Sequence, residues 1–226
     1  MGNSGSYAGF LAYTYRAAKS TFYRCVNKGK IGGLLTPQNE PMTNGVAGGF
    51  IASLDLYAAN PMSFYDCANY GDVSCGLDAG GFLGRATGNG GHTLAFLFVN
   101  CANYGEISTN NAESTNLGQA FVGLDVGMEH GTCTITVSNC LFTAENIYGR
   151  IAEQKSEDKV RLKFGNNQFF VTGEENVRVM NKELNTYAEE NQREPWVVGL
   201  VDQQMIPELQ IFADRIASVG TYIILK

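Results

Sequence analysis

Charged residues and long apolar runs are scarce in this chain. Asp, Glu, Lys and Arg make up 17% of its 226 residues, and the formal net charge is −6. An acidic chain without a basic stripe argues against a nucleic-acid-binding surface. No run of 18 apolar residues is present, so no membrane-spanning helix is expected. The first six residues have neither a charged nor an apolar region, so no signal peptide is expected either.

Glycine and aromatic residues are abundant by contrast. The chain has 27 Gly, 13 Phe and 11 Tyr. A composition low in charge and rich in Gly and aromatics is typical of an all-β protein with many turns. The length is ample for a hydrophobic core, and it suits one large domain or two small ones.

Two markers repeat along the first 150 residues. The template Cys-x-Asn-x-Gly-x-(Ile/Val) occurs at 25–31, 67–73 and 101–107, and Cys140 begins a degraded fourth copy. A second marker, Gly-Gly-Phe or a variant of it, ends at Phe10, Phe50, Phe82 and Phe121. The Cys spacings of 42, 34 and 39 residues change together with the Phe spacings of 40, 32 and 39. A unit of this period indicates a solenoid, a propeller or an array.

The pieces within each unit are the size of strands. Three short apolar pieces per unit, separated by Gly, Asn and Asp turns, favour β-structure over helical repeats. We therefore predict an all-β fold: a right-handed parallel β-helix of about four coils with a C-terminal β-rich cap. A β-propeller-like array is the alternative. In the β-helix, stacked Asn amides would bond from coil to coil, and the Gly two residues later would permit the turn.

Six cysteines permit three disulfides. Four of them occupy the same repeat position, which favours buried packing over a disulfide or a metal site: Cys25, Cys67, Cys101 and Cys140. No C-x-x-C pair suggests zinc. Cys75 and Cys133 lie outside the template and are the better candidates for a bridge or a free thiol.

The composition changes near residue 150. Residues 1–150 carry 17 charged side chains and residues 151–226 carry 21, although the second segment is half as long. The degraded fourth unit is typical of a terminal repeat. We assign 1–150 to the repeats and 151–226 to a cap or small β-rich domain that covers the end of the stack. Strands are expected at 159–164, 168–172, 176–180, 196–201 and 221–225, and a short helix or loop at 183–193.

The Cys-x-Asn-x-Gly-x-(Ile/Val) and Gly-Gly-Phe markers of residues 7–150 resemble those of the GLUG-motif repeat family, most closely at 79–108. The resemblance implies a β-solenoid module of large cell-surface or secreted proteins, hence an extracellular or cell-surface location. It brings no catalytic residue. It implies a noncatalytic role in adhesion, spacing or recognition of a glycan or partner protein. Further repeats or subunits would contact the ends of the solenoid, so a structural or assembly subunit is an alternative.

A third alternative is a carbohydrate-active β-helix enzyme, a lyase or a glycosidase, since such folds place carboxylates along one face. Asp72 and Glu106 occupy one template position in adjacent units, and Lys30 occupies the same position in the first unit. Solvated outward residues explain them better, with Lys30 and Asp72 forming a weak exposed ion pair. His92 and His130 are interpreted as loop histidines rather than metal ligands or acid–base groups.

The tyrosines of the Asn-x-Gly turns complete the candidate surface. Tyr70 and Tyr104 would lie one above the other, either as a ligand-binding ladder or as stacking that stabilises the sheet. We assign no catalytic residue, no cofactor and no metal ligand. The candidate binding face comprises Tyr70, Tyr104, Asp72 and Glu106.

Overall fold

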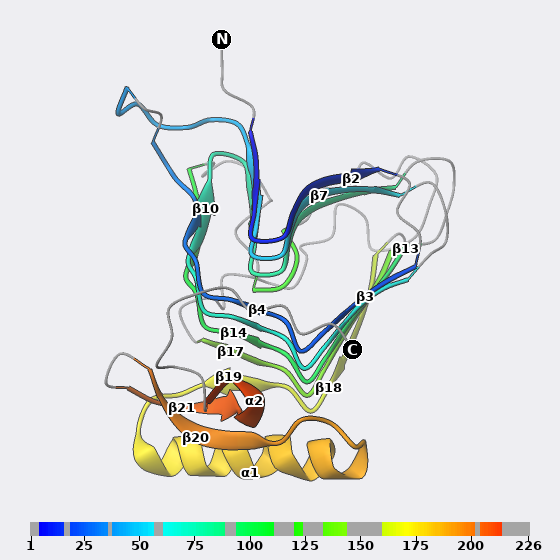
Figure 1. Ribbon diagram of the computed structural model, residues 1–226, viewed down its shortest axis with the longest axis vertical. Helices are drawn as coiled ribbons and strands as arrows, with labels where there is room; N and C mark the ends of the chain where they lie inside the picture. Colours follow the sequence, from blue (N-terminus) through cyan, green and yellow to red (C-terminus); the bar gives the residue numbers. More distant parts are fainter. Residues whose placement is uncertain are drawn as a thin grey trace.

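Each of the first three repeat units folds into five short strands, which appear stacked in Figure 1. The computed structural model describes residues 5–15, 19–35, 38–56, 61–88, 94–110, 120–123, 133–143, 160–201 and 204–213. The strands are β1 (Ser6–Ala8), β2 (Leu11–Tyr15), β3 (Ser20–Tyr23), β4 (Val26–Asn27) and β5 (Ile31–Gly32); β6 (Val46–Gly48), β7 (Ile51–Leu56), β8 (Met62–Tyr65), β9 (Ala68–Asn69) and β10 (Val73–Cys75); and β11 (Asp78–Gly80), β12 (Leu83–Gly88), β13 (Leu94–Val99), β14 (Ala102–Asn103) and β15 (Ile107–Thr109).

The expectation of three strands per unit is wrong, because two bends divide the predicted pieces. One bend lies at the Gly-Gly-Phe marker, where a Cβ on Gly49 would come within 2.1 Å of the Gly81 carbonyl oxygen. The other lies immediately before the template Cys, where Asp66 and Asn100 adopt positive φ angles of 53° and 56°. Asn and Asp tolerate this left-handed conformation better than most residues.

Corresponding strands of successive units pair in parallel. Phe22, Phe64 and Phe98, for example, occupy the same position of β3, β8 and β13. The fourth unit adds β16 (Cys133–Ser138) and β17 (Leu141–Thr143), and β18 (Val160–Gly165) and β19 (Gln168–Phe170) extend the same two sheets beyond residue 150. The described part of the chain is thus mostly β with parallel sheets. This pairing disagrees with the antiparallel blades of the propeller alternative.

Aromatic columns fill the main core. Phe50 stacks on Phe82 with ring centroids 4.7 Å apart, and Phe64 stacks on Phe98 at 5.0 Å. Rings of the two columns also meet edge to face, as Phe64 and Phe82 do at 5.4 Å. Offset stacks and edge-to-face contacts are the favourable aromatic geometries. The repeated Phe positions therefore stabilise the association of one unit with the next.

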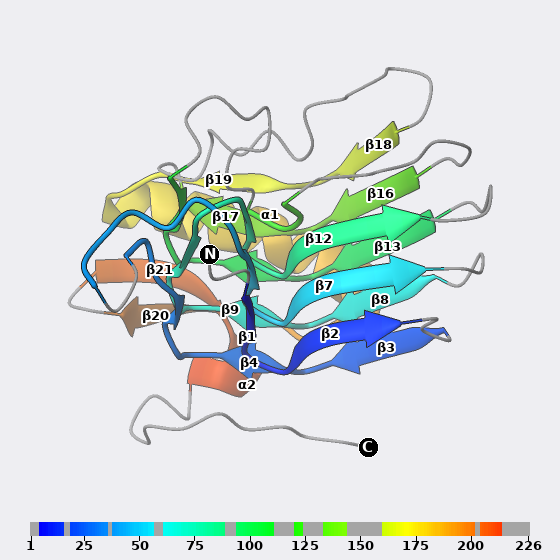
Figure 2. The ribbon, with the colours of Figure 1, turned by 90° about the horizontal axis from the view of Figure 1, so that it is seen from above.

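The C-terminal segment contains helix α1 (Glu174–Glu190), an antiparallel hairpin of β20 (Trp196–Val201) and β21 (Gln204–Leu209), and the short helix α2 (Gln210–Ala213). It packs against the outer face of the sheet ordered β19-β17-β14-β9-β4, as Figures 1 and 2 show. The apolar contact joins Val26, Ala68, Ala102, Leu141 and Phe170 of the sheet to Val177, Met180, Leu184, Ala188, Trp196, Ile206, Leu209 and Phe212. The segment covers the side of the stack along these strands, so of the expected cap at 151–226 only β18 and β19 lie at an end of the stack.

The strand expected at 176–180 is wrong, since these residues belong to α1. The buried side chains of α1 recur at the spacing of one helix face: Val177, Met180, Leu184 and Ala188. The strands expected near 159–164, 168–172 and 196–201 are confirmed. The strand expected at 221–225 lies outside the described residues. Within the described residues, no helix has the length and apolarity needed to cross a membrane.

Candidate functional site

The template asparagines form a buried ladder between units. Asn27 Nδ2 donates to Asn69 Oδ1 at 2.7 Å, and Asn69 Nδ2 donates to Asn103 Oδ1 at 2.7 Å. Each amide also bonds to the carbonyl of the glycine two residues later, at about the same distance in all three units. The predicted structural role of these asparagines is confirmed. Their polar groups are used within the stack.

A second polar column, which the sequence analysis missed, runs one residue before the cysteines. Asn100 Nδ2 donates to Asp66 Oδ1, Asn139 Nδ2 to Asn100 Oδ1, and Asn166 Nδ2 to Asn139 Oδ1, each at 2.7 Å. All members have φ between 51° and 56°, and Arg24 begins the column with φ 53°. The signal in the sequence was the Asn before Cys101 and Cys140. Arg24 and Asp66 occupy the same position in the first two units, and this change of residue type concealed the repeat.

The C-terminal segment is bonded into this second column. Trp196 Nε1 donates to Asn100 Oδ1 at 2.6 Å, and Asn100 Nδ2 donates to the Glu194 carbonyl oxygen at 2.8 Å. The Glu194 carboxylate forms an ion pair with Arg24 at 2.8 Å. Burial raises the pKa of Glu194, and the Asp66 charge adds to this, although Arg24 opposes it. This group of residues holds the segment in place.

Tyr70 and Tyr104 lie one above the other, as expected, with ring centroids 4.8 Å apart and an interplanar angle of 18°. Both rings are partly buried against the C-terminal hairpin. Tyr70 Oη donates to Glu208 Oε1 at 2.5 Å, and Tyr104 Oη donates to the Pro207 carbonyl oxygen. The hydroxyls of this pair are therefore engaged by the chain's own β21.

Glu208 is a buried carboxylate beneath this pair. Its second oxygen, Oε2, has no hydrogen-bond partner among the described residues. Burial raises the pKa of Glu208, while Tyr70 and the positive charge of Lys28 oppose that rise. Burial likewise raises the pKa values of Tyr70 and Tyr104. Burial therefore keeps both tyrosines protonated, and Glu208 keeps its proton to a higher pH than an exposed glutamate does.

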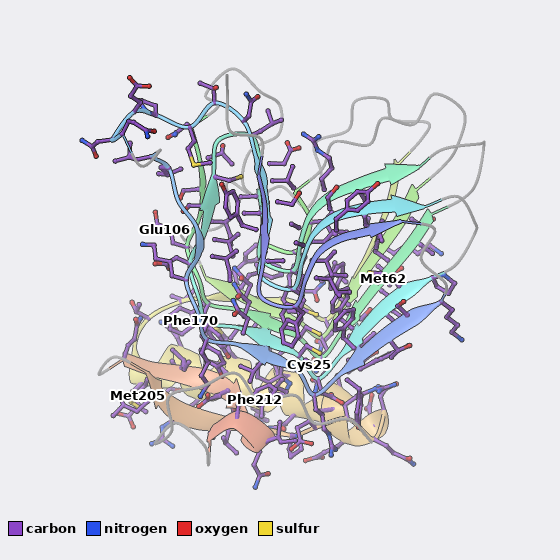
Figure 3. All side chains as sticks on the ribbon, turned by 45° about the horizontal axis from the view of Figure 1, so that its top comes forward. Cys25, Met62, Glu106, Phe170, Met205 and Phe212 are labelled. Atoms are coloured by element: carbon purple, nitrogen blue, oxygen red, sulfur yellow. The ribbon has the colours of Figure 1, made fainter. Side chains whose placement is uncertain are left out.

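The two candidate carboxylates lie away from the tyrosines. Lys30 Nζ is 3.7 Å from Asp72 Oδ2, with side-chain exposures of 70% and 49%, which confirms the expected exposed ion pair. The backbone N–H of Glu106 donates to Asp72 Oδ1 at 3.1 Å. Glu106 is exposed on the outer surface of the stack (Figure 3). The candidate face thus divides into a covered tyrosine pair and the accessible carboxylates Asp72 and Glu106, which form an accessible row with Lys30.

The repeated cysteines form a column of free, buried thiols: Cys25, Cys67, Cys101 and Cys140. The Cys25 N–H donates to Cys67 Sγ at 3.4 Å, and the Cys101 N–H donates to Cys140 Sγ at the same distance. Burial raises the pKa of Cys67 and Cys101, and the hydrogen bond with Cys67 is the main cause of the raised pKa of Cys25. Protonated, buried thiols are poor nucleophiles. The expected packing role is confirmed.

The remaining candidates are the two other cysteines and the two histidines. Cys75 is a free buried thiol, and burial raises its pKa to about 11. His92 and His130 lie outside the described residues, as does the side chain of Cys133. Within the described part of the chain, no cluster of three or more His, Cys, Asp or Glu side chains is arranged to hold a metal ion.

Comparison with known proteins gives no match to a family model, a curated protein or a solved structure. The resemblance to the GLUG-motif repeats therefore rests on the motif residues alone.

Proposed function

We propose that this chain is a parallel β-helix module of a larger cell-surface or secreted protein, in which it acts as a rigid, noncatalytic scaffold for spacing or adhesion. The observation that carries the proposal is the use of the template side chains. Asn27, Asn69 and Asn103 bond to one another between units, and the thiols of the Cys column bond to backbone groups. Side chains used in this way hold coils together rather than act on a ligand.

The accessible row of Lys30, Asp72 and Glu106 is the part of the candidate face that a glycan or partner protein could reach. Carboxylates and a lysine on an exposed edge accept and donate hydrogen bonds to sugar hydroxyls or protein side chains. The stacked tyrosines are left out of this surface, because β21 already holds both hydroxyls. Adhesion through this row is the specific form of the scaffold proposal.

A unit insertion tests the scaffold. A second copy of residues 76–109 placed after residue 109 should be accepted as one more coil. It should lengthen the stack by about 4.8 Å, the spacing of neighbouring strands. Fluorophores attached to the first unit and to the degraded fourth unit would measure the change in distance relative to the parent, and far-UV circular dichroism would report the β content. An insert that unfolds the chain, or that loops out without changing the distance, would contradict a coil-by-coil scaffold.

Adhesion and catalysis are separated by a second experiment. Beads coated with the chain should bind members of a glycan array or cultured cells, and the double variant D72N/E106Q should bind less. A control variant, E175Q in the exposed first turn of α1, should bind as the parent does. The same proteins would be incubated with a panel of soluble polysaccharides. Release of new reducing ends by the parent, lost in D72N/E106Q, would favour an enzyme and overturn the noncatalytic proposal.

A further inference from the structure

The first repeat unit leaves part of the core uncovered. Leu11 occupies the same position as Ile51 and Leu83, which are fully buried, yet Leu11 is 43% exposed. Phe10 and Phe22 begin the two aromatic columns and are only partly buried. Terminal units of stacked repeats usually carry a polar outer face. The apolar side chains at this side of the stack therefore need a cover.

The backbone of β3 is open along the same side. β3 is an edge strand, as is β2 of the neighbouring sheet, and Figure 2 shows both strands along one side of the stack. The N–H of Ser20 donates to the Pro61 carbonyl oxygen in the second unit. Thr21 alternates with Ser20, so its N–H and C=O point away from the second unit. We call this side of β2 and β3 the open edge.

The last described residues of the chain lie close to the open edge. Arg24, the residue after β3, forms an ion pair with Glu194 at 2.8 Å. The Glu194 carboxylate also accepts a hydrogen bond from the backbone of Ile211 in α2. Figure 2 shows α2 near β4, which belongs to the first unit. The chain therefore leaves α2 at Ala213 beside the C-terminal end of β3.

A strand-like sequence follows α2. Residues 214–226 lie outside the described residues, and the strand expected at 221–225 is among them. Its sequence, Thr-Tyr-Ile-Ile-Leu, carries no charge and favours a strand because it is rich in β-branched and aromatic residues. Residues 214–220 can span up to about 23 Å, which exceeds the length of about 13 Å of the four-residue β3. The expected strand can therefore reach the whole of β3.

We propose that residues 221–225 pair with β3 as an antiparallel strand and cover the open edge. The direction follows because a chain that leaves α2 beside the end of β3 must run back along that strand. Its backbone would bond to the outward N–H and C=O of Thr21. Its inward side chains would cover Phe10, Leu11 and Phe22. An edge closed in this way does not pair with another chain. The inference goes beyond the scaffold function and does not depend on it.

Hydrogen–deuterium exchange at the Thr21 amide of the full chain tests the proposal. Side chains alternate across a strand, so one alternate pair of the apolar residues faces the open edge. One of the double variants Y222K/I224K and I223K/L225K should therefore speed exchange by at least about tenfold, because the amide loses its partner. The other double variant changes outward side chains and should alter exchange less than about twofold.

Two variants of described residues complete the test. L11K places a charge on the open edge, so it should also speed exchange at Thr21 by about tenfold. The matched control L200K changes a leucine of β20 that is 59% exposed, and it should leave exchange at Thr21 as in the parent. Circular dichroism should show the β content of the parent in every variant.

Three results would overturn the proposal. The first is a Thr21 amide that exchanges as rapidly in the parent as in all the variants. The second is an equal effect of the two double variants, which would indicate apolar contact without a paired strand. The third is protection that rises with protein concentration between about 1 and 100 μM, which would assign the added strand to a second copy of the chain.

Discussion

Trp196 donates its indole N–H to Oδ1 of Asn100 at 2.6 Å, and this bond connects the C-terminal segment to the repeat stack. The same Asn100 oxygen accepts from Asn139 of the next unit. One buried amide therefore belongs both to the second polar column between units and to the docking of the segment. Neither region is independent of the other at this point.

Replacing Trp196 tests this connection. W196F keeps an aromatic ring at this position but removes the indole N–H. Asn100 Oδ1 then loses one of the two N–H groups that donate to it. We expect a loss of about 1–2 kcal/mol in the free energy of unfolding. Urea unfolding followed by circular dichroism measures it, because Trp196 is the only tryptophan of the chain. V198A, on the exposed side of β20, is the control and should change little. Equal losses in both variants would contradict a specific role for the bond.

The asparagine ladder predicts a larger effect. N69A removes a fully buried amide that bonds to Asn27, Asn103 and the Gly71 carbonyl. Two partners in neighbouring units are left unpaired, at about 1–3 kcal/mol each, so we expect a loss of about 2–5 kcal/mol. N191A removes an exposed amide at the end of α1 and should cost less than about 0.5 kcal/mol. Chemical denaturation of both variants compares the buried with the exposed amide.

Stability should depend on pH through Glu208. Burial raises its folded-state pKa above the unfolded value, so the folded chain binds more protons in that range. The contribution is favourable at low pH and is lost as pH rises through the unfolded and then the folded pKa. The groups that face Glu208 are Tyr70, Tyr104, Lys28 and Gly199; of these, Tyr70 through its hydrogen bond and Lys28 through its charge favour the charged form, and burial outweighs both. Glu194 shifts in the same direction.

The variant E208Q isolates this effect. It keeps the shape of the side chain and a neutral amide, so the fall in unfolding free energy between pH 4 and pH 8 should become smaller. Urea midpoints at intervals of half a pH unit would show the change in slope. E175Q removes an exposed carboxylate and should leave the slope of the parent. A slope unchanged in E208Q would mean that Glu208 titrates equally in the folded and unfolded chain.

The sequence predicted the contacts that repeat and missed those that do not. The Asn and Cys columns could be read because one residue type returns at one template position. The column through Arg24, Asp66 and Asn100 shares a backbone conformation rather than a residue type, so it was not recognised. The partners of the tyrosines could not be predicted either, because Glu208 and Pro207 lie more than 100 residues further along the chain.

Helix α1 shows a different limit. Val177 and Val179 suggested a strand because β-branched residues favour strands. The helical spacing from Val177 to Leu184 was the better signal, but it extends across residues that were divided between an expected strand at 176–180 and a short helix or loop at 183–193. Burial against the sheet then decides the conformation, since α1 packs its apolar face on that outer surface. Tertiary packing here overrides local β propensity.

The two repeat markers depend on each other, and Gly81 tests that dependence. A Cβ on Gly81 would lie 2.1 Å from the Ala120 carbonyl oxygen and 2.3 Å from Asn103 Oδ1. G81A must therefore displace both the neighbouring backbone and the asparagine ladder, which should cost about 3 kcal/mol or more. The matched control is G33A, because a Cβ on Gly33 would meet nothing within 4 Å. Thermal unfolding of both variants should show a large decrease for G81A alone. A tolerated G81A would mean that the glycine marker is not required for the close approach of the Asn turn and the Phe bend.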